Sequence, residues 1–367
     1  MRDNFTPGKG TLAFALLAAF LTIKPTQKRA VDVLFGILKE ILLSLPHSLR
    51  ISVVRHILGQ IGRRGQIMMD LSTAPHGSQW DWITPIESSE ANVKGYWIDQ
   101  SVQMHADRQE FIRATASKTD LTILYIHGGG FRMGTSLMYT ETYIRLLQTL
   151  KNSFGVNARV CTMDYRFAPE WNVGQMLDAV LEVYKHLLSS GVQPSKLIIG
   201  GDSAGGYLTA MALSRIRDMQ MPTPLGAIIV SPLVTYLTDS SSFAKHKAFD
   251  CIPDNLARQN FKELFPQLEF TSEEESTTYL RSVFPLYSDT TSFPPVLVTY
   301  GKRERFSDHI EAFIHSLKQA DIQVEVIAKD NEPHVFNVTP FLASSKRVWA
   351  DQVDQMAGWC AKRLEEQ

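Results

Sequence analysis

Ser203 has the residue type and the neighbours of an activated nucleophile. It lies in Gly201-Asp202-Ser203-Ala204-Gly205-Gly206, directly after the apolar run Lys196-Leu197-Ile198-Ile199-Gly200. The pattern Gly-x-Ser-x-Gly is typical of a tight turn between a buried strand and a helix, where the serine adopts a strained backbone conformation. Small flanking residues avoid Cβ clashes, and the helix N-terminus directs free N–H groups at a reacting carbonyl. A turn that needs glycine only for packing is the alternative, but the flanking strand and helix patterns favour a serine nucleophile.

A second glycine-rich segment follows another apolar run. Leu121–Ile126 leads into His127-Gly128-Gly129-Gly130-Phe131. Three successive glycines expose amide N–H groups, and such preorganised donors stabilise the oxyanion of a tetrahedral intermediate by about 3 to 4 kcal/mol each. A flexible loop is the alternative interpretation of the glycines. The two motifs together favour an oxyanion-binding loop.

Together these motifs resemble those of the hormone-sensitive-lipase-like branch of the α/β-hydrolases. The resemblance covers roughly residues 95–360 and is strongest at the two glycine motifs and at Asp164-Tyr165-Arg166-Phe167-Ala168-Pro169-Glu170. It extends to Ser231-Pro232-Leu233, Phe293-Pro294-Pro295 and the segment near Gly301. Within the branch, the chain looks most like the fungal steryl acetyl hydrolase and natural-product esterase group. The resemblance implies an α/β-hydrolase fold: a mainly parallel sheet with helices on both faces and a helical cap.

The catalytic acid is expected after the next-to-last strand, because this fold imposes the order serine, acid, histidine along the chain. Pro295–Tyr300 reads as that strand. By similarity to the family segment Gly-x-x-acid-x-Leu-x-Asp, Glu304 takes the acid position, where many members have Asp. Either carboxylate can orient the imidazole and stabilise its cation. Asp308 is the competing candidate, but beside Ser307 it reads as a helix-start residue, which favours Glu304.

The general base must be one of ten histidines. His334 lies in the polar segment Asn331–Phe336, after a strand predicted over Ile322–Ala328. Its order in the chain and its loop position favour it, and the resemblance includes its His-x-Phe neighbourhood. His309 and His315 also follow the acid, but they fall in a predicted amphipathic helix, where a surface or packing role is more common.

The oxyanion donors are carried over by motif position as the backbone N–H groups of Gly129, Gly130 and Ala204. His127 is expected to brace the loop through side-chain hydrogen bonds and not to act as a catalyst. The predicted acyl transfer needs no cofactor and no metal. The three cysteines are too scattered for a zinc site and suggest no disulfide framework, which favours a reducing compartment: Cys161, Cys251 and Cys360.

Strand and helix patterns alternate through the centre of the chain and predict a mainly parallel sheet covered on both faces. The predicted elements are strands over 121–126, 157–163 and 196–200, helices over 138–151 and 174–189, and an elbow helix over Ala204–Met219. Residues 1–90 precede this pattern and residues 236–285 interrupt it. The resemblance implies that both stretches form a cap that lines the substrate pocket. We therefore predict an N-terminal apolar segment with cap helices over 1–90 and a catalytic domain over 91–367, with a cap insertion near 236–285.

The segment Thr11–Ile23 is apolar and uncharged, but its 13 residues are fewer than the ~20 that span a bilayer. No small-x-small cleavage site follows; Lys24, Lys28 and Arg29 come instead. Two interpretations stay open: an anchor helix at a membrane surface, and a cap helix over the substrate entrance. Helical apolar spacing over 31–61 suits either. We expect an intracellular protein, cytoplasmic or associated with a membrane such as the endoplasmic reticulum, and secretion is disfavoured.

Length and composition fit one enzyme domain. The 367 residues with 44% hydrophobic content suffice for a large α/β core and a cap. A net charge of −1 gives no electrostatic case for nucleic acid, and the sequence carries no signal of oligomeric state.

The favoured function is therefore a serine carboxylester hydrolase that acts on a small hydrophobic ester, such as an acetylated sterol or another lipophilic natural product. One alternative is a non-hydrolytic or intramolecular step in natural-product biosynthesis at the same site. The other is a ligand-binding protein on a disabled scaffold, which the presence of His334 disfavours.

Overall fold

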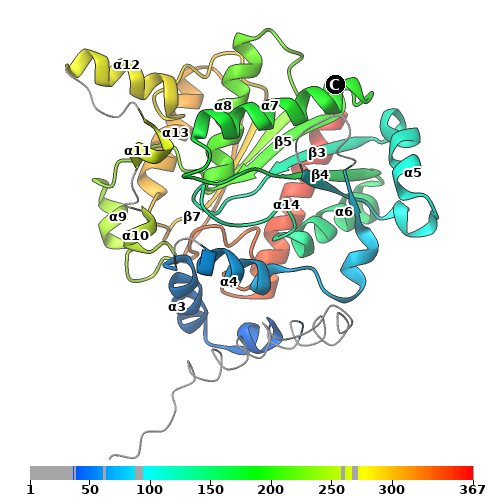
Figure 1. Cartoon of the computed structure of the whole chain (residues 1–367), viewed down its shortest axis with the longest axis horizontal. Helices are drawn as coiled ribbons and strands as arrows, with labels where there is room; N and C mark the ends of the chain where they lie inside the picture. The colour runs from blue at the N-terminus through cyan, green and yellow to red at the C-terminus, as the bar shows by residue number, and fades with distance from the viewer. Residues whose placement is uncertain are drawn as a thin grey trace, which may run out of the picture.

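The structure is a computed structural model of the chain and describes residues 36, 39–60, 63–86, 94–257, 261–266 and 272–366. Its centre is an eight-stranded sheet in the order β1-β2-β4-β3-β5-β6-β7-β8 (Figure 1). The strands are β1 Ile83–Pro85, β2 Lys94–Ile98, β3 Leu121–Ile126, β4 Ala158–Asp164, β5 Leu197–Asp202, β6 Gly226–Val230, β7 Val296–Gly301 and β8 Val324–Lys329. Only the pairs β1–β2 and β2–β4 are antiparallel, so the predicted mainly parallel sheet is confirmed.

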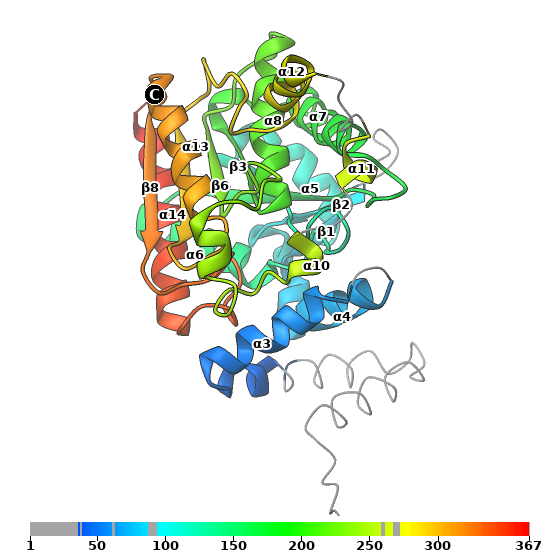
Figure 2. The same ribbon diagram turned by 90° about the vertical axis from the view of Figure 1, so that its left-hand side faces the viewer.

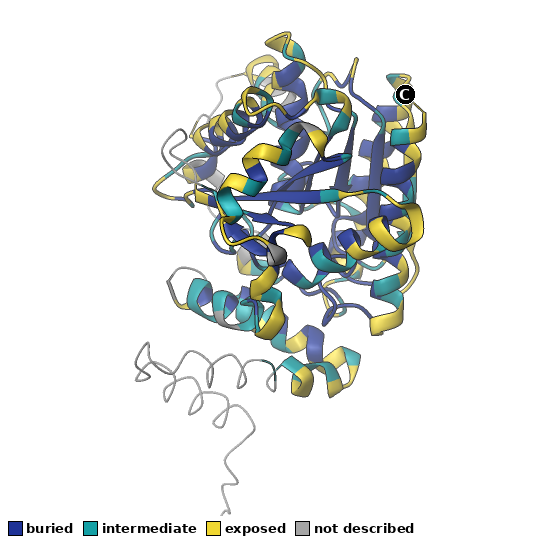
Figure 3. Ribbon diagram, turned by 90° about the vertical axis from the view of Figure 1, so that its right-hand side faces the viewer, coloured by how far each residue is buried: buried dark blue, intermediate teal, exposed yellow. Residues whose placement is uncertain are grey.

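Helices cover both faces of the sheet, as predicted. The α-helices are α3 His47–Leu58, α4 Arg63–Thr73, α5 Arg108–Thr115, α6 Thr140–Phe154, α7 Val173–Ser189, α8 Ala204–Asp218, α9 Ser241–Lys245, α10 Asp254–Ala257, α11 Phe261–Leu264, α12 Glu273–Val283, α13 Ser307–Gln319 and α14 Lys346–Glu365. One apolar cluster joins the sheet to α7, α8 and α13, and the other joins it to α6 and α14 (Figure 1). Strands β3, β5, β6 and β7 are buried along their whole length (Figure 3), which explains why their sequences are continuous apolar runs.

Local signals fix the ends of the two helices that flank β4. Asn172 caps the N-terminus of α7. Its side chain accepts a hydrogen bond from the N–H of Gln175, and the Gln175 side chain accepts one from the N–H of Asn172. Helix α6 ends at Gly155, which adopts the left-handed conformation that glycine permits (φ 70°). The last residue of α6, Phe154, and the first of α7, Val173, lie within three residues of the predicted ends at 151 and 174.

The order of the strands brings the two glycine motifs together. From β3 the chain passes through α6 to β4 on one side of β3, and then through α7 to β5 on the other side. The connection therefore reverses direction at β3 and β5, and ligands bind at the carboxyl ends of strands at such a point. His127 follows β3 and Ser203 follows β5, so both motifs lie at that edge.

The sheet begins earlier than predicted. Residues 1–90 were expected to precede it, but Ile83–Pro85 pairs antiparallel with β2 and forms its edge. A strand of three residues is too short to show a periodic pattern. The division at residue 90 otherwise stays a prediction.

Helices α3 and α4 pack against each other outside the sheet (Figure 2). His47, Arg50 and Arg55 of α3 make hydrogen bonds to backbone carbonyls of the body, at Leu342, Phe341 and Asp250 among others. The apolar segment Thr11–Ile23 lies outside the described residues. So do residues 31–35, 37, 38 and 61 of the stretch 31–61 with helical apolar spacing. No helix in the described ranges has the length and apolar character needed to cross a bilayer.

Candidate active site

The turn that carries Ser203 is strained. Ser203 has φ 52° and ψ −116°, between the last residue of β5 and the first residue of α8. Its N–H donates to the carbonyl of Val230 (2.9 Å), and its own carbonyl accepts from Leu233 (3.0 Å). A Cβ at Gly205 would lie 2.1 Å from the carbonyl oxygen of Ile126, so only glycine permits this close approach of helix and strand. The serine is therefore held at the end of the sheet in a conformation that the surrounding backbone imposes.

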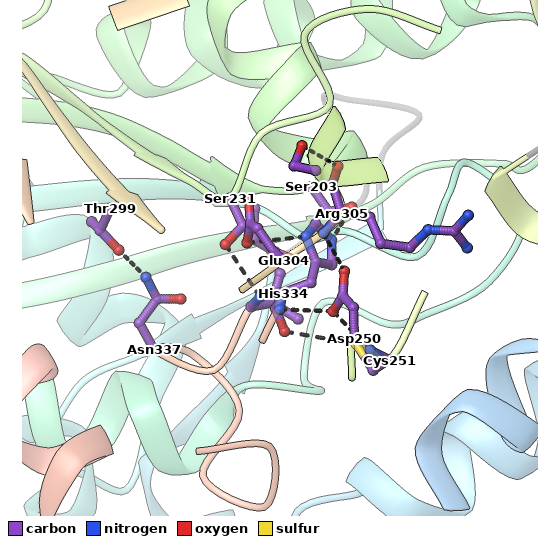
Figure 4. Close-up of polar contacts among 12 residues, drawn as sticks. Ser203, Ser231, Asp250, Cys251, Thr299, Glu304, Arg305, His334 and Asn337 are labelled. Atoms are coloured by element: carbon purple, nitrogen blue, oxygen red, sulfur yellow. Dashed lines mark hydrogen bonds and ion pairs between the residues drawn. The ribbon is translucent and has the colours of Figure 1, made fainter. Parts of the chain in front are cut away.

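The side chains of Ser203, His334 and Glu304 come from three loops and form one line of contacts. The Nε2 atom of His334 lies 2.9 Å from the Oγ of Ser203, and its Nδ1 lies 3.4 Å from Oε2 of Glu304 (Figure 4). The second distance is longer than an ordinary hydrogen bond and is within ion-pair range. Glu304 is 0% exposed and His334 is 2% exposed, whereas Ser203 is half-buried and faces the pocket. The structure thus brings together the predicted nucleophile, base and acid.

The charge around His334 favours its protonated form. Burial alone lowers the pKa of His334, but the neighbouring carboxylate of Glu304, followed by the charges of Asp250 and Asp202, raises it above its usual value. Burial raises the pKa of Glu304, and His334 partly offsets that effect. Since Nδ1 faces a carboxylate, the neutral ring carries its proton on Nδ1. Its Nε2 is then free to accept a hydrogen bond from the Ser203 hydroxyl.

The predicted oxyanion loop lies beside the nucleophile. Gly129 (φ 110°) and Gly130 (φ 63°) line the same pocket as Ser203. Ala204 is the first residue of α8, where backbone N–H groups have no partner within the helix. Gly129 and Gly130 therefore share the pocket with Ser203, and Ala204 follows Ser203 directly in the chain.

Buried polar side chains hold this loop in place. Asp202 accepts a hydrogen bond from the N–H of Gly128 (3.0 Å) and another from the hydroxyl of Tyr139 (2.6 Å). Tyr165 donates to the carbonyl of His127 (2.8 Å) and stacks on its ring at 4.6 Å. The ring of His127 lies 2.7 Å, through Nδ1, from the carbonyl of Gly128, in agreement with the predicted bracing role. Burial raises the pKa of Asp202 to about 6, although Tyr139 and His334 favour its charged form.

An apolar pocket opens above Ser203 and contains about 960 Å³ of empty space, its open mouth included. Its walls come from α3, α4, the loop between β3 and α6, and the segment after His334. The lining residues are Leu42, Val54, Ile57, Leu58, Met69, Ser72, Thr73, Gly129, Gly130, Met138, Tyr139, Asp202, Ser203, Leu233, Ile252, Phe306, His334, Val335, Thr339, Phe341 and Leu342. Among the described residues, no group of three or more His, Cys, Asp or Glu side chains has a metal-binding arrangement.

Residues 123–338 match the family model described as alpha/beta hydrolase fold. The chain belongs to the α/β-hydrolase family. Over 224 residues it is 31% identical to an esterase of Acinetobacter venetianus, covering 61% of this chain and 69% of the relative. Over 230 residues it is 27% identical to an acetyl-hydrolase of Streptomyces hygroscopicus, covering 62% and 71%.

The solved structure of an esterase from the bacterial hormone-sensitive lipase family has a TM-score of 0.68 and 22% identity, and the match covers 88% of this chain and 99% of that one. These matches confirm the predicted α/β-hydrolase fold, and the fold is shared with that hormone-sensitive lipase family structure. The chain is an ester hydrolase of the α/β-hydrolase family.

The rejected candidates lie elsewhere in this hydrolase. Asp308 belongs to the first turn of α13, as predicted, and accepts a hydrogen bond from the N–H of Ser242 (2.8 Å). His309 lies 3.7 Å from Asp239, and His315 is also in α13.

Three residues near the site have contacts that we did not predict. Asp202 lies inside the motif around Ser203, and Ser231 lies inside Ser231-Pro232-Leu233, so both were within segments that the resemblance singled out. Ser231 accepts a hydrogen bond from the N–H of Val335 (3.2 Å), next to His334. Asp250 accepts one from the N–H of His334 (2.9 Å). It comes from the interrupting stretch 236–285, where no motif marks it.

Proposed function

We propose that this α/β-hydrolase cleaves esters of hydrophobic molecules by acyl transfer to Ser203, with His334 as general base and Glu304 as the acid that orients it. The observation that carries the proposal is the chain of contacts Ser203–His334–Glu304 at the floor of an apolar pocket. A neutral imidazole with one nitrogen on a hydroxyl and the other on a buried carboxylate can accept the serine proton.

In the first half-reaction, Ser203 Oγ attacks the ester carbonyl carbon while its proton passes to His334 Nε2. The backbone N–H groups of Gly129, Gly130 and Ala204 hold the oxyanion of the tetrahedral intermediate. The intermediate collapses, the bond to the alcohol oxygen breaks, and His334 donates its Nε2 proton to that oxygen. The acyl group remains on Ser203.

In the second half-reaction, water takes the place of the alcohol. His334 accepts a proton from the water as its oxygen attacks the acyl carbon, and the proton then returns to Ser203 as the carboxylic acid leaves. Throughout both halves, the carboxylate of Glu304 stabilises the imidazolium.

The pocket supports a hydrophobic substrate. Most of its wall side chains are apolar, apart from Ser72, Thr73 and Thr339, and the hydroxyl of Tyr139 is already bonded to Asp202. The similarity to the acetyl-hydrolase of Streptomyces hygroscopicus supports a short acyl group, such as acetate, on a hydrophobic alcohol. We also propose that α3 and α4, together with the 236–285 insertion, form the cap that covers the substrate.

The test is labelling with a fluorophosphonate probe, followed by turnover of p-nitrophenyl esters of increasing chain length. We expect the wild type to be labelled and active, and Ser203→Ala and His334→Ala to lose both. Ser214 is a buried serine of α8 outside the pocket lining, so Ser214→Ala serves as the control and should keep both labelling and activity. Folded wild-type protein without labelling would overturn the proposal. Labelling together with a product that is not the free acid would instead indicate transfer or ring closure.

A further inference from the structure

Asp250 is a buried carboxylate that connects the two loops carrying the acid and the base. It lies between α9 and α10 and is 0% exposed. Its Oδ1 accepts hydrogen bonds from the N–H groups of His334 (2.9 Å) and Cys251 (2.7 Å), and its Oδ2 accepts one from the N–H of Arg305 (2.7 Å) (Figure 4). Arg305 directly follows Glu304. One side chain therefore holds the backbone at the base and next to the acid.

Asp250 extends the connection between these two loops. Glu304 follows β7 and His334 follows β8, and beyond the last paired residues a backbone hydrogen bond runs from the N–H of Arg303 to the carbonyl of Glu332 (3.1 Å). Asp250 adds contacts at Arg305 and at His334 itself. Buried backbone N–H groups require acceptors, and an ionised carboxylate makes stronger hydrogen bonds than a neutral acceptor. A carboxylate with one oxygen facing each loop accepts hydrogen bonds from the buried N–H groups of both loops. It also sets the distance between the two loops.

Asp250 is itself held from two sides. Arg55 of α3 donates to the carbonyls of Asp250 and Ala248, both at 2.8 Å. The guanidinium of Arg305, 1% exposed, donates to the carbonyls of Phe243 (3.0 Å) and Ile252 (3.1 Å) and pairs with Asp254 (2.9 Å). The segment that carries Asp250 is thus attached to α3 and to the acid loop, so the carboxylate has a fixed position.

We propose that Asp250 is a positioning residue of the hydrolytic site: it aligns His334 with Glu304 and Ser203 and keeps a negative charge beside the imidazole. The proposal rests on the function proposed for these three residues. It assigns a role in the reaction to the 236–285 insertion, which was expected only to line the pocket.

The charge of Asp250 gives the proposal a signature. The acidic groups that face His334 are Glu304, Asp250 and Asp202, and each raises the pKa of His334 against the effect of burial. The titratable and charged residues around Asp250 itself include Arg55, Arg305, His246, Cys251 and Glu304. Removal of the Asp250 charge lowers the pKa of His334, so the acidic limb of the rate profile moves to lower pH.

The test is Asp250→Asn, with kcat and KM measured from pH 5 to 9 per active site titrated with fluorophosphonate. Asparagine has one acceptor oxygen, so it cannot hold both loops, and it has no charge. We expect kcat to fall roughly 10- to 100-fold, as misalignment of reacting groups predicts, with KM for a short ester unchanged and the acidic limb displaced to lower pH.

Asp99→Asn is the matched control, because Asp99 is another buried carboxylate, which pairs with the buried Arg159 (3.5 Å) away from the pocket lining. It should lower the free energy of unfolding without moving the acidic limb. If Asp250→Asn does not fold, Arg55→Ala takes its place. This variant removes the hydrogen bonds from α3 to the carbonyls of Asp250 and Ala248 and leaves the Asp250 carboxylate intact. Arg55→Ala should lower kcat by about 3- to 10-fold at constant KM, a smaller misalignment than that of Asp250→Asn.

Three outcomes separate the two proposals. An active, labelled wild type with an unchanged kcat and acidic limb in Asp250→Asn would overturn the role of Asp250 alone. If Asp250→Asn does not fold, a wild-type kcat in Arg55→Ala would overturn it instead. An unlabelled, inactive wild type would overturn the proposed function, and the role of Asp250 with it.

Discussion

The floor and the walls of the pocket are attached to the fold in different ways. The floor consists of Ser203, His334 and the glycine loop, with Glu304 buried beside His334, and all of them lie at the carboxyl ends of strands. Backbone hydrogen bonds and close glycine contacts hold them, and Phe131, Ser203, Ser231 and Val335 all have positive φ. One part of the walls comes from α3 and α4, which lie outside the sheet and present ordinary helical side chains to the cavity.

This difference separates two kinds of requirement. The floor needs particular atoms at particular positions, so a small change in geometry removes an interaction that the transition state needs. The walls need apolar volume, which several side chains can supply, and one methylene changes discrimination by only ~1 to 3 kcal/mol. Substitutions in the floor should therefore alter turnover, whereas those in the walls should alter which ester is preferred.

The largest effect is expected for Glu304→Gln. The amide cannot stabilise an imidazolium, so kcat should fall by roughly 10³- to 10⁴-fold with KM nearly constant. In the wild type, kcat/KM should decline as the pH falls through the raised pKa of His334. The variant lacks the carboxylate that raises this pKa, so its residual activity should persist to lower pH. A pH–rate profile of both proteins checks this, and an unmoved acidic limb would remove Glu304 from the acid position.

Next in size is Gly205→Ala in the elbow. The new Cβ would lie 2.1 Å from the carbonyl of Ile126, and the strand and helix must separate to admit it. We expect the free energy of unfolding in urea to fall by about 3 kcal/mol, with loss of ester turnover. Gly174→Ala in α7 is the control, since its Cβ would meet only the Asn172 side chain at 3.2 Å. Equal stability of the two variants would contradict the tight contact.

A smaller effect is expected in the wall. Ile57 of α3 lines the pocket, and Ile57→Trp should fill part of it. The ratio of kcat/KM for a long-chain ester to that for acetate should fall by about 10- to 100-fold, while acetate turnover stays near the wild-type value. Val53→Trp, on the same helix but outside the lining, should leave the ratio unchanged. A fall in acetate turnover as large as that in long-chain turnover would show that wall and floor are not separable.

The smallest effect is expected from thiol reagents. Cys161, Cys251 and Cys360 are free and buried. Burial raises the pKa of Cys161 and Cys360 to about 12 and raises that of Cys251 well above its usual value. The nucleophilic thiolate is therefore scarce, and iodoacetamide at neutral pH should leave ester turnover unchanged. Mass spectrometry of the treated native protein should show no alkylated cysteine, and rapid inactivation would contradict the buried positions.

The sequence predicted the floor much better than the walls, for a physical reason. A buried parallel strand must be an apolar run, and a strained turn or close backbone approach must have glycine, so β3, β5 and the loops after them leave a local record. Strand β3 was predicted residue for residue over Leu121–Ile126. His334 and Glu304 followed from chain order and family resemblance.

The remaining features depend on contacts between distant segments. Asp250 meets His334 across more than eighty positions of the chain, and nothing in its neighbours distinguishes it from a solvated aspartate. Strand β1 is identified by its pairing with β2 and not by its three residues. The helical apolar spacing over 31–61, which includes α3, allowed a membrane-facing or a pocket-facing role, and only the fold shows that α3 lines the cavity.

Helix α3 belongs to both parts of the site at once. Ile57 and Leu58 line the pocket, while Arg55, two residues earlier, bonds to the carbonyl of the aspartate that holds the base loop. Displacement of this helix to admit a larger ester would pull on that loop. New substrate preferences are therefore accessible to evolution, or to an engineer, through exchange of the side chains of α3 with its axis kept in place.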